Sequence, residues 1–155
     1  MNTQAENRRI ADWLALAHPL PGQARREWTD AHVAMIPLGR RFDAVRVPAE
    51  RIHAAVGSDE SATVAAALED WLRGPVVQDL RSGLGPYYVL VAPDAEWQGE
   101  EVRLSTGTYL GVPRVGHIAY LMTWVVQPQR PGDLCDVGCL RALLSVAEPL
   151  KAVES

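Results

Sequence analysis

Apolar residues near the start of the chain recur at the spacing of a helix with one buried face. The pattern i, i+3, i+4, i+7 is formed by Ile10, Trp13, Leu14 and Ala17. This spacing predicts a helix over residues 7–17, and His18-Pro19 favours its end there. Polar residues 1–6 are expected to be frayed, and residues 23–31 to form one helical turn anchored by Trp28.

Three further helices are predicted from apolar spacing and from residues that start or stop helices. Pro48 begins a short one that Gly57 ends. The next begins at a cap among residues 58–61 and ends at Gly74-Pro75. Its apolar face comprises Val64, Leu68, Trp71 and Leu72. Asp136 caps the last helix, which Pro149 ends. The apolar face of that helix comprises Leu140, Leu143, Leu144 and Ala147.

Short segments rich in strand-forming residues alternate with glycine and proline. Residues 32–38 and 42–47 flank Gly39-Arg40-Arg41, a spacing that predicts a β-hairpin. In the second segment, a period of two separates Asp43, Val45 and Val47 from Phe42, Ala44 and Arg46. Residues 87–91 are continuously apolar, as in a central strand covered on both faces. The glycines at 83 and 85 precede this strand, which favours a turn over a phosphate loop. Other strands are expected at residues 76–77, 102–104, 108–112 and 118–126.

This order of elements predicts one α+β domain over residues 7–149, followed by a tail of residues 150–155. The expected architecture is a mixed or mostly antiparallel sheet packed by the N-terminal, central and C-terminal helices. A length of 155 residues fits one domain. No apolar run approaches the roughly 20 residues that span a bilayer, so no membrane partner is expected. Two cysteines are too few for a disulfide framework and favour the cytoplasm.

Charge is distributed unevenly along the chain. Residues 1–56 carry eight arginines against six acidic residues, whereas residues 57–155 carry seven basic residues against thirteen acidic ones. The net charge of −4 does not favour non-specific nucleic-acid binding, although a local basic patch is compatible with it. Only one of the fifteen basic residues is a lysine, which is typical of a GC-rich coding genome.

Cysteines and histidines match no established catalytic or metal-binding spacing. Cys135 and Cys139 are expected one turn apart on one face of the last helix, as small core residues; a redox pair or a zinc site are the alternatives. His53 is expected to pair with Glu50, three residues before it. Two histidines remain candidates for catalysis: His32 and His117.

Arginines gather in two segments. Arg40, Arg41 and Arg46 lie next to Phe42 and Asp43, and a sheet face with arginine and aromatic residues can bind phosphates or stacked bases. The segment 103–114 combines hydroxyls, a glycine turn and two arginines. The alternative interpretations are a solvated hairpin loop for the first segment and an ordinary β-hairpin for the second.

Five segments carry a family resemblance: residues 38–48, 74–77, 87–93, 107–114 and 133–136. They resemble short actinobacterial proteins grouped with the N-terminal domain of bifunctional DNA primase/polymerases, and the likeness extends over residues 32–145. The resemblance implies metal-dependent nucleotidyl transfer, run by a D-x-D-like acidic pair on a strand and a histidine that contacts the incoming triphosphate. Such a pair bridges two metal ions, magnesium or manganese.

The sequence departs from that family pattern at the positions that matter for catalysis. Asp43 is the one acid in the matching strand, Val45 or Arg46 stands at the second acidic position, and Thr108-Tyr109 stands where the histidine is expected. No D-x-D occurs in the chain. The resemblance therefore implies a scaffold that binds without polymerising. Its candidate binding residues are Arg40, Arg41, Asp43, Arg46, Arg103, Thr108, Tyr109 and Arg114.

Three functions are compatible with these observations. The leading hypothesis is a catalytically inactive primase/polymerase-like domain that binds nucleic acid, a nucleotide or a protein of DNA metabolism, with no cofactor. The second is a protein-interaction or regulatory module, including a homodimer, anchored by exposed aromatic residues. The third is a metal-dependent nucleotidyl-transfer enzyme in which Asp43 acts with His32 or His117 around magnesium or manganese.

Overall fold

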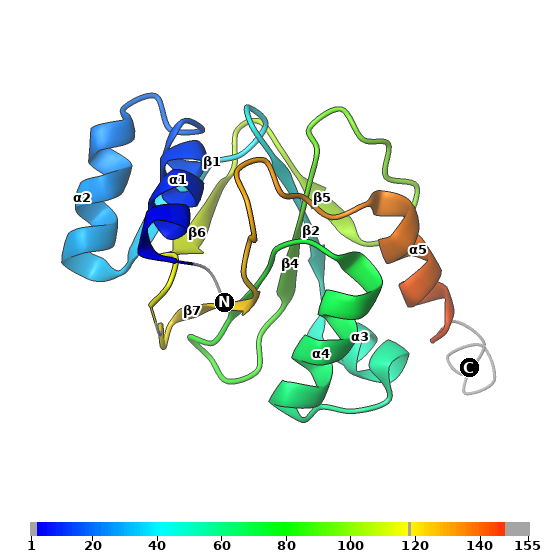
Figure 1. The fold of residues 1–155 in the computed structure, drawn as a ribbon. Coiled ribbons are helices and arrows are strands. Elements are labelled where there is room, and N and C mark those ends of the chain that lie inside the picture. Colours follow the sequence, from blue (N-terminus) through cyan, green and yellow to red (C-terminus); the bar gives the residue numbers. More distant parts are fainter. Residues whose placement is uncertain (1–2, 118, 148–155) are drawn as a thin grey trace.

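The computed structural model describes residues 3–117 and 119–147. These residues form five helices and seven strands (Figure 1). The helices are α1 (Gln4–Ala15), α2 (Pro21–Ala31), α3 (Ala49–Val56), α4 (Ser61–Leu72) and α5 (Val137–Ser145). The strands are β1 (Val33–Pro37), β2 (Asp43–Val47), β3 (Val76–Asp79), β4 (Tyr87–Val91), β5 (Val102–Leu104), β6 (Tyr109–Pro113) and β7 (Met122–Val126). The predicted tail of residues 150–155 and the predicted helix end at Pro149 lie outside the described residues.

Five strands form the main sheet in the order β5-β2-β4-β3-β7, and every neighbouring pair is antiparallel. The predicted central strand is confirmed, because β4 lies in the middle of this sheet with both faces covered. The predicted α+β class is confirmed as well. Its sheets are antiparallel, apart from an isolated parallel bridge between Val91 and Cys135.

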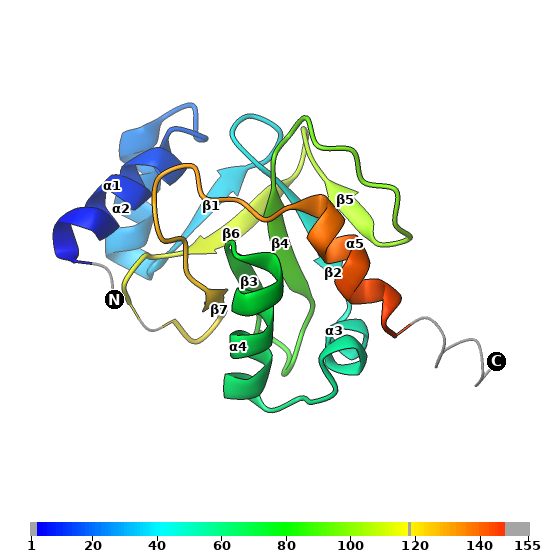
Figure 2. The ribbon, with the colours of Figure 1, turned by 45° about the vertical axis from the view of Figure 1, so that its right-hand side comes forward.

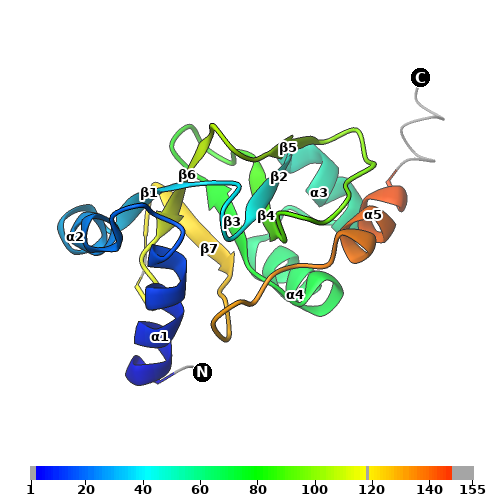
Figure 3. The same cartoon turned by 90° about the horizontal axis from the view of Figure 1, so that it is seen from above.

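The two faces of the main sheet belong to separate apolar cores, as the alternation in β2 predicts. Val45 and Val47 face a core that contains residues of α3, α4 and α5. Phe42 and Ala44 face the other core, which contains residues of α1, α2, β1 and β6. Figure 3 shows the corresponding layers, with α1 and α2 on one side of the strands and the other three helices on the opposite side.

The predicted hairpin between residues 32–38 and 42–47 is wrong. β1 pairs with β6 in a separate two-stranded sheet, and β2 pairs with β4 and β5 (Figure 2). The buried residues of β1 explain the choice, because Ala34 and Ile36 stand opposite Val112 and Leu110 on the core side of this ribbon. The segment 103–114 is not a hairpin either, since β5 and β6 belong to different sheets.

The predicted helices lie at the expected positions, but some differ from the prediction in their length or in the face that is buried. α1 begins at Gln4 behind a Thr3 cap, so residues 4–6 are helical instead of frayed. α2 extends over eleven residues, not one turn. Trp71 is 45% exposed, although the spacing placed it on the buried face of α4. The buried stripe of α4 follows i+4 steps through Val64, Leu68 and Leu72, which turns it away from Trp71.

No helix among residues 3–117 and 119–147 combines the length and the apolar character needed to cross a membrane.

Candidate functional site

Asp43, the acid that the family resemblance singles out, lies in a closed cluster at the start of β2. Its side chain is 1% exposed. The Arg103 Nε donates to Asp43 Oδ2 at 2.8 Å, and the Ser105 hydroxyl donates to Asp43 Oδ1 at 2.9 Å. Both donors lie near the same end of the sheet because β5 pairs with β2. We call Asp43, Arg103 and Ser105 the Asp43 cluster.

The guanidinium of Arg103 is occupied on its other sides by backbone carbonyls. One terminal nitrogen donates to the oxygens of Ala92 and Pro93, at 3.2 and 2.6 Å, and the other donates to the oxygen of Ala95. Arg103 therefore ties the β4–β5 connection to the start of β2. Four of the five N–H groups of this guanidinium are therefore bonded, which leaves one for a phosphate. The Asp43 carboxylate, which is 1% exposed, is closed to a metal ion from solvent.

Four of the predicted binding residues lie near one end of the β1–β6 ribbon. The turn that carries Arg40 and Arg41 meets the 105–108 turn, where the amide of Leu38 donates to the Thr108 oxygen at 2.9 Å. A Cβ at Gly39, whose φ is +96°, would lie 2.7 Å from the Thr106 amide nitrogen. Tyr109 is exposed beside this contact, and both arginines are exposed as well. We call these exposed turns the arginine tip; none of the four residues lines either of the two pockets described below.

Arg114 lines a different feature, a cavity of about 440 Å³ between α1, α2 and the segment after β6. We call it the α1–α2 pocket. Two of its basic residues lie on helices, Arg8 on α1 and Arg25 on α2. Arg114 follows directly after β6, and His117 lies three residues further along the chain. The volume falls in the range of small-molecule sites. The other lining residues are Gln4, Asn7, Ala11, Asp12, Trp28, Thr29, Val115 and Gly116.

Basic groups outnumber acidic ones in the α1–α2 pocket. Arg25 is paired, because its Nε and a terminal nitrogen both donate to Asp12 Oδ1, at 3.2 and 3.0 Å. Arg8 and Arg114 belong to no ion pair among the residues that the structure describes. The imidazole of His117 stacks on that of His32, with ring centroids 6.1 Å apart. Two guanidinium groups without an ion-pair partner in the described part of the chain, together with an imidazole at the same cavity, are suited to an anion with several oxygens.

The wall of this pocket is fixed by buried contacts. The indole of Trp28 donates to the backbone oxygen of Val112 at 2.9 Å, which fastens α2 to β6. A Cβ at Gly116, whose φ is +81°, would lie 2.6 Å from Asn7 Nδ2, so the segment after β6 passes close to α1. His32 ends α2 with a positive φ of 63°, a conformation that histidine adopts more readily than most residues. The basic side chains thus stand on restrained backbone.

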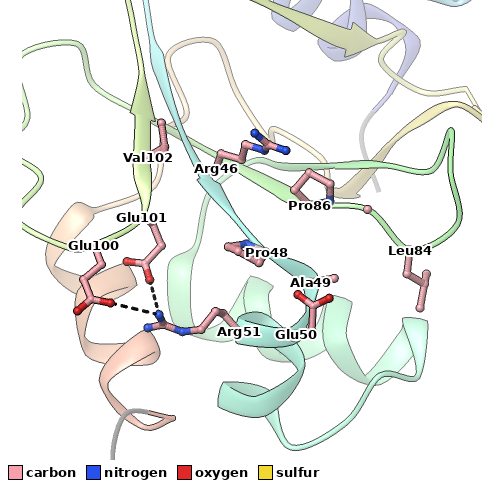
Figure 4. A pocket seen from close by; sticks show the side chains of 11 residues that line it. Arg46, Pro48, Ala49, Glu50, Arg51, Leu84, Pro86, Glu100, Glu101 and Val102 are labelled. Atoms are coloured by element: carbon pink, nitrogen blue, oxygen red, sulfur yellow. Dashed lines mark ion pairs between the residues drawn. The ribbon is translucent and has the colours of Figure 1, made fainter. Parts of the chain in front are cut away.

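A second cavity, of about 400 Å³, opens between the end of β2, the start of α3 and the β3–β4 turn (Figure 4). We call it the β2–α3 pocket. Arg46 lines it, together with charged residues that sequence analysis did not select: Glu50, Arg51, Glu100 and Glu101. The five predicted arginines therefore do not converge on one face. Two lie at the exposed arginine tip, one is enclosed in the Asp43 cluster, and one lines each pocket.

Comparisons with known proteins add no relative. No protein-family model matches the chain, and searches of curated proteins and of solved structures found no match.

The cysteines and His53 do not form the arrangements that the sequence favours. Cys135 precedes α5 and is buried, with its amide bonded to the Leu90 oxygen at 2.8 Å, and burial raises the pKa of its thiol. Cys139 is exposed on α5, so the expected shared face is wrong; both are free thiols. His53 contacts the Tyr87 hydroxyl at 2.8 Å in place of the expected Glu50. No three His, Cys, Asp or Glu side chains in the described ranges are placed to hold a metal ion.

Sequence reasoning missed Arg8 and Arg25, although each belongs to an adjacent arginine pair, because neither pair lies in a segment that carries the family resemblance. The excess of basic residues in the first 56 positions was the available signal. It did not show which of those arginines face a common cavity, since that depends on how α1 and α2 pack against β6.

Proposed function

We propose that this chain is a non-catalytic, primase/polymerase-like binding domain that holds a phosphate-bearing ligand in the α1–α2 pocket. The ligand is a nucleotide or the backbone of a single-stranded nucleic acid. The observation that carries the proposal is that two guanidinium groups, those of Arg8 and Arg114, line one cavity with His117 and form no ion pair with the residues that the structure describes.

Charge and shape both support a phosphate-bearing ligand. Guanidinium groups bind phosphate oxygens in pairs of parallel hydrogen bonds, and they retain their charge at every physiological pH. Arg8 and Arg114 line one pocket, whereas Arg40 and Arg41 are exposed at the arginine tip and line neither pocket. A net charge of −4 confines attraction for an anion to a local site of this kind.

Binding without catalysis is supported by the state of Asp43. Metal-dependent nucleotidyl transfer needs carboxylates that are free to bridge metal ions. The Asp43 carboxylate instead accepts bonds from Arg103 and Ser105 and is almost completely buried. The metal-dependent alternative predicts a thermal shift with magnesium, manganese or zinc, whereas our proposal predicts none.

The deciding experiment measures binding of a labelled nucleoside triphosphate and a labelled single-stranded oligonucleotide over a salt series. We expect affinity to fall as salt rises, with Arg8→Ala reducing the slope of log K against log salt for the oligonucleotide by about 0.7. Arg9→Ala is the matched control, because Arg9 is its exposed neighbour on α1 and does not line the pocket. Absence of binding at low ionic strength, or equal losses in the two variants, would refute the proposal.

A protein partner, including a second copy of this chain, is the alternative that exposed apolar side chains favour. Met35 and Tyr109 are 49% and 58% exposed on the outer face of the β1–β6 ribbon. Light scattering tests it: a dimer that Tyr109→Ser dissociates would support this function, and a monomer at all concentrations would count against self-association.

A further inference from the structure

On one side, the β2–α3 pocket is lined by one positive and one negative side chain above apolar walls. Arg46 and Glu50 both line it, and neither belongs to an ion pair among the described residues. Figure 4 shows Arg46 on the strand above Pro48 and Glu50 on the helix that follows. The apolar walls are Pro48, Ala49, Leu84, Pro86 and Val102. A ligand that carries charges of both signs would complement these two groups.

The opposite side of the pocket is acidic and tightly built. Arg51 of α3 lies 3.0 Å from Glu101 Oε2 and 3.9 Å from Glu100 Oε2 (Figure 4). The Trp97 indole donates to the Glu101 backbone oxygen at 2.8 Å. A Cβ at Gly99 would lie 2.9 Å from Glu101 Oε1 and closer still to the Trp97 ring. The loop before β5 is therefore packed around the Glu101 side chain and fixes its position.

Glu101 is short of hydrogen-bond donors. Its side chain is 2% exposed, and neither carboxylate oxygen accepts a hydrogen bond from the described residues, because Arg51 approaches as an ion-pair partner without hydrogen-bond geometry. A carboxylate offers about four acceptor positions, and leaving them unfilled in a buried place is costly. A donor brought by a ligand, through a small shift of Arg51, would fill them.

We propose that the β2–α3 pocket binds a small zwitterion of the basic amino-acid class, with one carboxylate and two cationic nitrogens. The three carboxylates and two guanidinium groups of the pocket sum to a charge of −1, which a ligand of charge +1 neutralises. The ligand carboxylate pairs with Arg46. Its cationic nitrogens pair with Glu50 and with the Glu100–Glu101 side, and its methylene groups cover the apolar walls.

Isothermal titration at low ionic strength tests this site with four free amino acids. L-lysine and L-arginine are expected to bind saturably. L-norleucine lacks the second cation of lysine and is expected to bind at least about 10-fold more weakly, which corresponds to the loss of one charged hydrogen bond. L-glutamate is expected not to bind. Lack of saturable lysine and arginine binding at about 10 mM, or norleucine binding as tightly as lysine, would overturn the proposal.

Two exposed side chains allow the site to be changed without disturbing the fold. Glu50→Gln and Arg46→Gln should each weaken lysine binding by about 10-fold, whereas Glu69→Gln, an exposed change on α4 away from this pocket, should leave it unchanged. Unaltered binding in both pocket variants would contradict the site. Glu101→Gln adds a second readout, because loss of the buried charge should weaken lysine more than norleucine. Arg8→Ala should not alter lysine binding, so failure of this site and of the phosphate site can be told apart.

Discussion

Arg103 and Arg114 flank the same segment of the sequence, but their guanidinium groups lie in different surroundings. Arg103 is enclosed between the Asp43 carboxylate and the backbone oxygens of residues 92–95. Arg114 lines an open cavity and has no ion-pair partner among the described residues. The first arginine holds parts of the fold together, and the second is the one that we propose to bind a ligand. The role of an arginine is therefore set by the groups that the fold brings to it.

The largest expected effect is on stability, in Arg103→Ala. This change leaves the buried Asp43 carboxylate without its cation, which costs about 3–5 kcal/mol. Urea unfolding followed by far-UV circular dichroism measures the loss. Arg40→Ala, at the exposed tip, is the control and should change stability by less than about 0.5 kcal/mol. Equal losses in the two variants would show that Arg103 is not a structural residue.

Ser105→Ala should have an intermediate effect. It removes the donor to Asp43 Oδ1 and keeps Arg103 in place, so a loss of about 1.5 kcal/mol is expected for a hydrogen bond to a charged group. Ser82→Ala, an exposed change in the β3–β4 turn, is the matched control for the same unfolding measurement. A loss in Ser105→Ala that matches the control would mean that solvent replaces the hydroxyl at Asp43.

Arg114→Ala should have the opposite effect to the one expected for Arg103→Ala: a loss of affinity with little loss of stability. Stability should change by less than about 0.5 kcal/mol, while the dissociation constant for a nucleoside triphosphate rises about 10-fold because one charged hydrogen bond is lost. Fluorescence anisotropy of a labelled nucleotide gives the affinity, and urea unfolding gives the stability. A variant that loses stability and keeps its affinity would place Arg114 with Arg103 as a structural residue.

The smallest expected effect concerns the ion pair of Asp79 with the exposed Arg81, which is less buried than the pair of Asp43 with Arg103. Hydrogen bonds from the Arg81 side chain, at 3.0 and 2.8 Å, lower the pKa of Asp79. A lowered pKa in the folded state adds stability above the unfolded pKa, and this stability is lost as pH falls through the folded value. In Arg81→Ala the pKa of Asp79 should rise toward its ordinary value in an NMR titration. An unchanged midpoint would show that the bond is open in solution.

Local structure was largely predictable from the sequence because it depends on nearby residues. The apolar spacing of α1 and α5, the Asp136 cap and the continuous apolar run of β4 each predict an element that the structure contains. The predictions were wrong where the pairing of a strand depends on residues that are distant in the sequence. Gly39-Arg40-Arg41 has the spacing of a hairpin, yet β1 pairs with β6 because their apolar residues share a buried face.

The candidate site was less predictable than the fold. The sequence selected Asp43 and Arg103 as binding residues, and their position on neighbouring strands makes them partners for each other. The sequence also selected Arg114, but it did not indicate that α1 and α2 complete the pocket around this residue. Partners separated by about a hundred residues, such as Arg8 and Arg114, leave no local pattern, and a pocket between them becomes visible only in the assembled fold.

The central claim is that phosphate is bound at the α1–α2 pocket and not at the Asp43 cluster or the arginine tip. An NMR titration of the isotope-labelled protein with a nucleoside triphosphate tests it most directly, by mapping which backbone amides and arginine Nε–H groups shift. We predict shifts at Arg8, Arg25 and residues 114–117, with the Arg103 Nε–H unchanged. Shifts centred on residues 40–46 and 105–109, or none at millimolar nucleotide, would contradict the account.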